Sequence, residues 1–410
     1  MPKLRFKNNL GCLYEIPDEV VLADVFDTVK ATNKDGKNKN VITNSAEYGL
    51  IPQRDFFDKD IAVEGNTEKY TIIEKGDFVY NPRKSTTAPY GPFNCYNREE
   101  PGIVSPLYSC LKPKDHSLTP YLLHYFSSPA WYSYIYHNGN QGGARHDRVG
   151  MTDDLLMGIP VLLPCSEERE KISEFLSLYD EKISIQKRKV EALENRKKGF
   201  LQQIFSQEIR FKADDGSEFD DWETEELNNY LYENKERNKA NFYGKKDVLS
   251  VSKDFGVVNQ IKYQGKSLAG EDVSNYHIVY EGNIVYTKSP LGKQPYGIIK
   301  ASTMTGIVST LYAVYHCKNN IIPQLLDYYF SLDDTLNCYL KPLVNIGAKH
   351  DMKVNNEDAI AGLVTLPTSL EEQKKIVSFF QKIDEQIRVE KDKLEAIKKV
   401  KKGLLQQMFV

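Results

Sequence analysis

The chain has 410 residues, enough for two ordinary domains with separate cores, and 40% of them are hydrophobic and 27% charged, as in globular proteins. The formal net charge of −3 excludes a protein that coats nucleic acid through its overall charge, so such a role needs local basic patches or a more basic partner. The start "MPKLRFKNNLG" has no apolar signal core, and no stretch of about 18 apolar residues occurs, so we expect a cytoplasmic protein.

The first 165 residues predict an α+β module. "YTIIEKGDFVYN" (Tyr70–Asn81) contains short strand-like runs interrupted by turn-forming residues. "LTPYLLHYFSSPAWYSYIY" (Leu118–Tyr136) predicts packed helices with a proline near the start. Short strands followed by separate helices are typical of an α+β fold.

Residues 166–206 predict one long helix. Ser166 followed by acidic residues is typical of a helix N-terminus. Apolar residues recur at three- and four-residue steps and form one stripe, which includes Ile172, Phe175, Tyr179 and Ile183. Charged residues fill the other faces of the helix. About 40 residues at about 1.5 Å each make a rod of about 60 Å.

The second half of the chain repeats the first. Glu167–Phe205 aligns without a gap on Glu371–Phe409, so that "KKGFLQQIF" lies over "KKGLLQQMF". Upstream, "GIVSPLY" (Gly102–Tyr108) returns as "GIVSTLY" (Gly306–Tyr312), and "GGARHD" returns as "IGAKHD". A period of about 200 residues is far too long for a solenoid repeat and indicates a duplicated domain.

Residues 207–369 therefore predict a second α+β module, and residues 370–410 a second long helix. The second module repeats the strand pattern in "YHIVYEGNIVYT" (Tyr276–Thr287) and the helix pattern in "IIPQLLDYYFSLDDTLNCYL" (Ile321–Leu340). The second helix has the same apolar stripe, which includes Ile376, Phe379, Ile383 and Ile387.

Two amphipathic helices in one chain can cover each other. The favoured prediction is an antiparallel coiled coil that relates the two modules by a pseudo-two-fold axis; the alternative is that each helix packs on its own module. Gly199 and Gly403 weaken the two helices at the same point and allow a kink there. The loops differ between copies, as expected for one scaffold with two targets, or for neutral drift after duplication.

The sequence shows no motif of a catalytic site. The segment around Gly265-Lys266-Ser267 is not a P-loop, because Gln260 stands where the first glycine is needed, and no GxSxG, HExxH or metal-ligand spacing occurs. "NPRK" (Asn81–Lys84) departs from the Asn/Asp-Pro-Pro-aromatic motif of adenine methyltransferases at its third and fourth residues. His146 and His350 each precede an aspartate, but neighbouring residues on a strand point to opposite faces, which favours a binding or structural role. We predict no catalytic residue and no metal.

Basic, amide and aromatic residues lie on predicted loops at matching positions of both copies. Arginine and lysine neutralise phosphates, and arginine also binds guanine edges, so these loops favour contact with DNA over the alternative of solvated turns. The predicted DNA-binding residues are Tyr80, Arg83, Lys84, Tyr90, Gln141, Arg145, His146 and Arg148 in the first copy, and Tyr286, Lys288, Lys293, Tyr296, Lys349, His350 and Lys353 in the second.

This organisation resembles the specificity subunit of type I restriction–modification systems over the whole chain. The resemblance is carried by the helix starts "EEREKISEFLSLYDEKI" and "EEQKKIVSFFQKIDEQI", by the two "KKG" helix ends, and by "GIPVLLP" and "GLVTLP" before the helices. "DWE" (Asp221–Glu223) also fits, whereas the first module has Pro17-Asp18-Glu19 there, without the tryptophan.

The resemblance implies a DNA reader that is not itself an enzyme. Residues 1–165 and 207–369 would be target-recognition domains for the two halves of a bipartite, asymmetric DNA sequence, and residues 166–206 and 370–410 would be spacer helices whose apolar residues also dock partners. Two methyltransferase subunits would bind S-adenosylmethionine and methylate adenine, restriction subunits would join them, and no cofactor would bind this chain. Two alternatives stay open: a coiled-coil scaffold with two paired protein-binding modules that binds no DNA, and a self-contained enzyme, which would need a nucleophile or cofactor loop.

Overall fold

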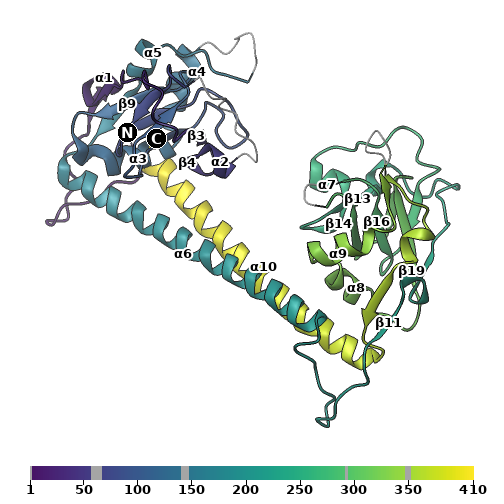
Figure 1. Cartoon of the computed structure of the whole chain (residues 1–410). Coiled ribbons are helices and arrows are strands. Elements are labelled where there is room, and N and C mark those ends of the chain that lie inside the picture. The colour runs from purple at the N-terminus through teal and green to yellow at the C-terminus, as the bar shows by residue number, and fades with distance from the viewer. Residues whose placement is uncertain (1, 57–66, 140–146, 291–293, 347–351) are drawn as a thin grey trace. The chain divides into compact units, whose positions relative to one another are not determined.

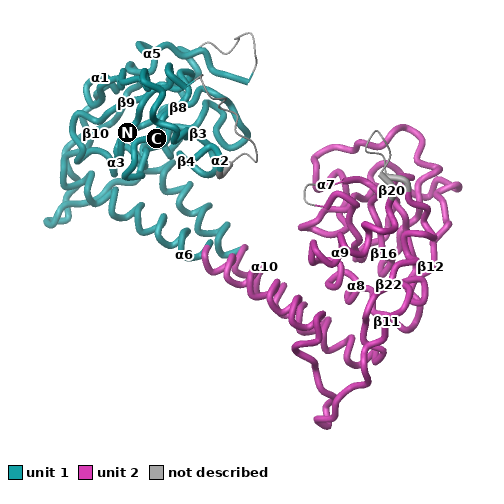
Figure 2. Tube along the Cα trace, viewed as in Figure 1, with its two compact units in different colours: residues 1–187, 392–410 teal, residues 188–391 magenta. Residues whose placement is uncertain are grey.

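The computed structural model describes residues 2–56, 67–139, 147–290, 294–346 and 352–410. It divides into two compact units (Figure 2): unit 1 contains Met1–Lys187 and Asp392–Val410, and unit 2 contains Arg188–Lys391. The unit boundaries lie inside the two long helices, α6 (Ser166–Phe205) and α10 (Leu370–Phe409). These helices (Figure 1) begin and end within a residue or so of the predicted ranges, and each contributes residues to both units (Figure 2).

The modules of the two units have their main strands and helices in the same order, mixed helix and strand as predicted. In unit 1 the elements are β1 (Asp18–Val21), α1 (Leu22–Val25), β2 (Phe26–Thr28), β3 (Ile42–Ser45), β4 (Gly49–Pro52), α2 (Gln53–Phe56), β5 (Thr71–Ile73), β6 (Phe78–Tyr80), β7 (Phe93–Cys95), β8 (Gly102–Val104), β9 (Ser109–Pro113), α3 (Thr119–Ser127), α4 (Tyr132–Asn138), α5 (Asp153–Met157) and β10 (Pro160–Leu163). In unit 2 they are β11 (Glu223–Glu226), β12 (Leu231–Glu233), β13 (Leu249–Ser252), β14 (Gly256–Asn259), α7 (Gln260–Gln264), β15 (His277–Val279), β16 (Ile284–Thr287), β17 (Ile298–Ala301), β18 (Gly306–Val308), β19 (Tyr312–Cys317), α8 (Pro323–Tyr329), α9 (Asp333–Leu340), β20 (Asn345–Ile346), β21 (Met352–Lys353) and β22 (Leu363–Leu366).

Each module is built on a four-stranded antiparallel sheet. The strand order is β2-β9-β6-β7 in unit 1 and β12-β19-β16-β17 in unit 2. Two-stranded pairs surround each sheet in matching fashion: β3 with β4 and β5 with β8 in unit 1, β13 with β14 and β15 with β18 in unit 2. The duplication seen in the sequence is therefore a duplication of topology.

The central strands are covered on both faces. Phe78, Val79 and Tyr80 of β6 are all fully buried, so successive side chains on opposite faces both meet core residues. On one face the Phe93 and Phe126 rings stack at 3.7 Å, which fixes α3 against β7. Each predicted helical segment is two short helices, α3 and α4 in unit 1 and α8 and α9 in unit 2, with the expected proline in the first turn of α3 and α8.

The long helices pair antiparallel within each unit. In unit 1 Lys401 of α10 forms an ion pair with Asp180 of α6, and in unit 2 Lys197 of α6 lies 2.5 Å from Asp384 of α10. Residue numbers thus rise along one helix as they fall along the other. Both helices continue unbroken through Gly199 and Gly403. The predicted coiled pair is confirmed, and each helix also packs on a module.

The two "KKG" segments end in module cores. Phe409, at the end of α10, lies 5.3 Å from Tyr121 and belongs to the core of unit 1. Phe205, at the end of α6, lies 5.2 Å from Tyr329 in unit 2. Each long helix therefore begins beside the module that precedes it in the chain and ends in the unit that contains the other module.

A buried arginine–glutamate pair joins each module to the start of its own long helix. Arg5 donates to both carboxylate oxygens of Glu168 at 3.2 and 2.6 Å, and Arg210 donates in the same way to Glu372 at 3.2 and 3.0 Å. Both glutamate side chains are 1% exposed. Across the described ranges we find no helix with the length and apolar character needed to cross a membrane.

Candidate nucleic-acid interface

In unit 1 two predicted basic segments form a short antiparallel ladder. Lys84 N donates to Asp147 O at 2.8 Å, and Val149 N donates to Pro82 O at 2.9 Å. These two bonds flank Arg83 and Arg148, which face each other as a bridge pair. In this type of pair the Cα atoms are close and both side chains lie on one face of the ladder. The fold therefore joins residues that stand far apart in the sequence.

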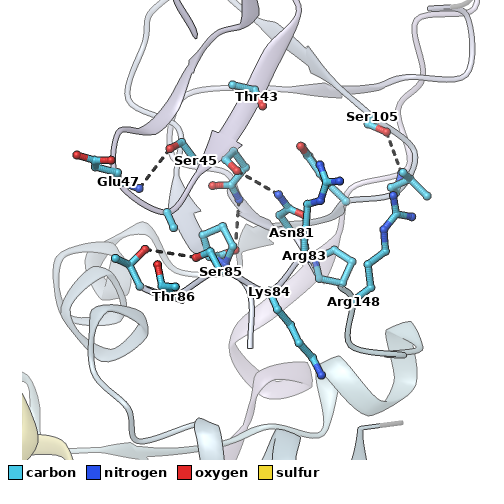
Figure 3. Close-up of a pocket in the computed structure, with 17 residues that line it drawn as sticks. Thr43, Ser45, Glu47, Asn81, Arg83, Lys84, Ser85, Thr86, Ser105 and Arg148 are labelled. Atoms are coloured by element: carbon cyan, nitrogen blue, oxygen red, sulfur yellow. Dashed lines mark hydrogen bonds between the residues drawn. The ribbon is translucent and has the colours of Figure 1, made fainter. Parts of the chain in front are cut away.

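The ladder borders an open cavity of about 450 Å³ (Figure 3). The β3–β4 hairpin contributes Ser45 and Glu47 to the lining, and the ladder contributes Arg83 and Arg148. Figure 3 also shows that Lys84 extends away from both arginines. The cavity combines guanidinium donors, a carboxylate and hydroxyl groups, which suits an edge with both acceptors and donors.

Buried amides hold the hairpin against the central sheet. Asn44 is 4% exposed, and its Nδ2 donates to Val79 O at 2.7 Å. The backbone oxygen of Asn44 accepts from Asn81 Nδ2 at 3.1 Å. Asn94 Nδ2 donates to Asn44 Oδ1 at 2.6 Å. These asparagines are not among the predicted functional residues, although an asparagine inside an apolar strand is a signal for such a role, because a buried amide needs partners.

Asp147 orients one of the two arginines. Its Oδ2 accepts from Arg83 Nε at 3.3 Å, while the arginine side chain stays 66% exposed. In the sequence this aspartate is notable only because it follows His146. In the structure it is a partner of Arg83.

Tyr80 and Tyr286 were wrongly predicted to contact DNA. Both are 1% exposed, and their hydroxyls donate to Tyr90 O at 2.8 Å and Tyr296 O at 2.7 Å. Burial raises the pKa of both phenols. They belong to β6 and β16, whose two faces are both covered by core residues, so neither side chain reaches the surface.

The backbone requires the glycine of the "PYG" turn that follows each of these strands. Gly91 and Gly297 adopt φ of +89° and +96°, and a Cβ there would lie 2.0 Å from Asn81 O and 1.9 Å from Thr287 O. Only glycine permits this close approach. Tyr90 is half-buried against Tyr132, with ring centroids 5.1 Å apart.

Unit 2 has different chemistry at the matching place. Lys288 donates to Asn356 Oδ1 at 2.5 Å, and Asn356 Nδ2 donates to Glu233 Oε1 at 2.6 Å. Burial lowers the pKa of the Lys288 ammonium. In the repeat alignment the counterparts of Arg83 and Arg148 are Ser289 and Met352, so the arginine pair belongs to unit 1.

The other predicted binding residues divide into two groups. Tyr296 is half-buried and packs against the core of unit 2, and Lys353 lies in β21. The remaining ones lie outside the described residues: Gln141, Arg145, His146, Lys293, Lys349 and His350.

The helix residues predicted to dock partners serve internal packing. Four of them are buried in their own unit, which rules out an exposed docking role for Ile172, Ile376, Ile383 and Ile387. Phe175 and Phe379 are half-buried. Each packs against a phenylalanine that precedes the first strand of its module, Phe6 and Phe211 respectively, with ring centroids 5.7 Å apart. Tyr179 and Ile183 are half-buried as well. The reason is that the apolar stripe faces both the second helix and a module.

Within the described ranges no group of histidine, cysteine, aspartate and glutamate side chains could hold a metal ion. No protein-family model matches the chain. A curated relative from Methanocaldococcus jannaschii, named as the MjaX type I restriction enzyme specificity subunit, is 25% identical over 318 residues, which are 72% of this chain and 68% of the relative.

Two solved structures share the fold. One is a chain from a study of complex assembly and conformational transition of the type I R-M system, with a TM-score of 0.52 and 13% identity over 97% of this chain and 99% of that chain. The other is the type I restriction–modification S subunit from M. genitalium, with a TM-score of 0.50 and 13% identity over 100% of this chain and 99% of that chain. Specificity subunits of type I systems are non-catalytic, in agreement with the prediction that this chain is not an enzyme. In sequence and in fold, therefore, the chain is similar to the specificity subunits of type I restriction–modification systems.

Proposed function

We propose that the chain reads a bipartite, asymmetric DNA sequence, with one module for each half. The observation that carries the proposal is one framework present twice with different polar chemistry at the same place. Unit 1 presents Arg83 opposite Arg148, whereas unit 2 has Lys288 bonded to Asn356. Because direct reading of bases depends on which donors and acceptors face the groove, the two modules would select different half-sites.

The paired helices would set the distance between the half-sites. α6 and α10 are each a single helix of 40 residues, and a helix is a stiffer spacer than a loop. Removing one heptad from both helices shortens the pair by about 10 Å, which equals the length of about three base pairs. Such a variant should recognise the same half-sites with fewer unread base pairs between them.

The partners would supply catalysis and part of the DNA clamp. Two methyltransferase subunits would bind S-adenosylmethionine and methylate adenine, and restriction subunits would add cleavage. The net charge of −3 is consistent with partners that neutralise much of the DNA backbone. The alternative is a scaffold that binds proteins only.

Salt dependence separates these two functions. DNA affinity of the chain assembled with its methyltransferase subunits should fall steeply between 50 and 200 mM salt, by about a thousandfold or more if six or more phosphates are contacted. Assembly that retains no DNA, or retains it equally at both salt concentrations, would support the protein scaffold and reject the DNA reader.

Module exchange tests the division of labour. Residues 1–165 are replaced by the corresponding module of another specificity subunit, and the methylated sequence is read by single-molecule sequencing. One half-site should change while the other half and the spacing stay the same. The matched control exchanges residues 207–369 and should change the other half. A change in both halves from a single exchange contradicts the modular function.

A further inference from the structure

We propose that Arg83 and Arg148 select a guanine, so that the half-site read by unit 1 contains a G·C pair. Unit 2 has no arginine pair at the matching place. This inference rests on the proposed DNA-reading function and concerns the chemistry of one module. It starts from the ladder of Pro82–Lys84 with Asp147–Val149, whose central pair is the two arginines.

The arginine pair is unfavourable without an acceptor between the two side chains. Arg83 and Arg148 stand directly opposite each other on one face of the ladder. Like charges in that position destabilise a strand pair. The carboxylate of Asp147 lies beside Arg83 and balances part of this charge. A ligand that presents acceptors to both guanidinium groups would remove the remaining repulsion.

The Asp147 contact leaves the end of the Arg83 guanidinium, with its two Nη atoms, available to a base. The carboxylate takes the Nε donor at 3.3 Å. The two Nη atoms then form the outward fork, and a fork of two parallel donors matches O6 and N7 of guanine. A guanidinium held at Nε also loses less side-chain freedom when it binds.

The cavity favours a base pair over a phosphate. Glu47 lines the same cavity as the two arginines and Lys84, and its carboxylate lowers the positive charge that a phosphate would meet there. The same carboxylate can accept a hydrogen bond from the N4 amino group of cytosine. Donors from arginine together with an acceptor from glutamate therefore match the two partners of a G·C pair. Asn44 and Asn81 hold the hairpin and the ladder in place around this site.

The test uses the chain assembled with its methyltransferase subunits and the conservative variants Arg83→Lys and Arg148→Lys. Lysine keeps the charge but lacks the fork, so it can replace arginine at a phosphate and cannot replace it at guanine. We expect each variant to lose about 10- to 100-fold in affinity for the cognate duplex. We also expect methylation to accept other base pairs at one position of the half-site of unit 1.

Arg98→Ala is the matched control, because it removes an exposed arginine of unit 1 that does not line the cavity. It should leave the methylated sequence unchanged. Assembly of each variant with the methyltransferase subunits, together with an unchanged circular dichroism spectrum, confirms that folding is retained.

The outcomes separate this inference from the proposed function. If exchange of residues 1–165 alters neither half-site, the DNA-reading function itself fails. If the exchange alters one half, but that half contains no G·C pair or both lysine variants keep full discrimination, only the guanine inference is overturned. Equal weakening on every sequence by Arg83→Ala and Arg148→Ala, with binding restored by lysine at the same positions, would assign the pair to phosphate and also overturn the inference.

Discussion

The pair of Arg210 and Glu372 allows a sharp test of how a module is held to its helix. The substitution is Arg210→Met, which keeps an unbranched stem in place of the aliphatic part of the side chain and removes the guanidinium. Glu372 then keeps Trp222 Nε1, at 3.1 Å, as a side-chain donor. Asp220 O, which accepts from Arg210 Nη2 at 2.6 Å, loses that donor as well.

The expected loss is about 3–4 kcal/mol of unfolding free energy. Removing one partner of a buried ion pair costs about 3–5 kcal/mol, because the other charge stays buried. A carboxylate can escape by binding a proton, which for an ordinary glutamate costs about 3.7 kcal/mol at pH 7 and about 1 kcal/mol at pH 5. This escape sets a ceiling, and it predicts that the defect of the variant shrinks as the pH falls.

Urea denaturation followed by tryptophan emission and circular dichroism measures this loss at pH 7 and pH 5. Trp222 reports directly, since its indole touches the perturbed carboxylate. Arg5→Met is the matched variant in unit 1 and should lower the free energy of unfolding by a similar amount, because Arg5 also donates to both carboxylate oxygens of Glu168. The double variant Arg210→Met with Glu372→Met should recover most of the stability, since no buried charge is left.

A loss below about 1 kcal/mol at pH 7 would refute the reasoning, because it would mean that the pair is a solvated surface contact. A double variant no more stable than Arg210→Met would refute it too. The cost would then come from packing of the side chain and not from the orphaned charge.

Three further predictions concern single positions. Gly91→Ala should destabilise unit 1 by more than about 2 kcal/mol in the same denaturation assay, because the new Cβ would lie 2.0 Å from Asn81 O at a φ of +89°. Gly199→Ala should instead raise the free energy of unfolding by about 0.5–1 kcal/mol. No atom lies within 4 Å of the Cβ that alanine would add, and alanine favours a helix. His124→Tyr should flatten the pH dependence of stability between about pH 4 and 6.5, measured by urea denaturation across that range.

The histidine prediction has a defined sign. Burial, with help from Lys401 and against Asp180, lowers the pKa of His124 to about 4. The unfolded chain therefore binds more protons between pH 6.5 and 4, so stability is full above about pH 6.5 and falls with pH, by about 3 kcal/mol at pH 4. Tyr328 occupies the matching place in unit 2 and donates to Asp384 at 2.8 Å, which shows that tyrosine suits this position. An unflattened profile for His124→Tyr contradicts the assignment.

Local sequence patterns are sufficient to predict the duplication, the mixed helix and strand content of both modules and the two long helices. These features are recorded in local patterns: apolar spacing along a helix and repeated motifs. The glycine of each "PYG" motif also has a local cause, since its positive φ excludes other residues.

Which side chains reach the surface depends on how the elements pack, and the sequence does not show it. Tyr80 was expected at an interface, yet β6 is covered on both faces, and a three-residue strand has too little alternation to show this. The buried helix isoleucines were misassigned for a related reason, since an apolar stripe does not say whether a helix or a module covers it.

The arginine pair is the clearest case of what tertiary structure adds. Arg83 and Arg148 come from two loops that the sequence suggested separately, and nothing local indicates that they face each other or that Asp147 holds one of them. Likewise, the chain order places each "KKG" segment after its own module, while the fold buries it in the core of the unit that contains the other module. Spacing along the chain determines elements, whereas contacts between distant segments determine the site, because they depend on how those elements pack.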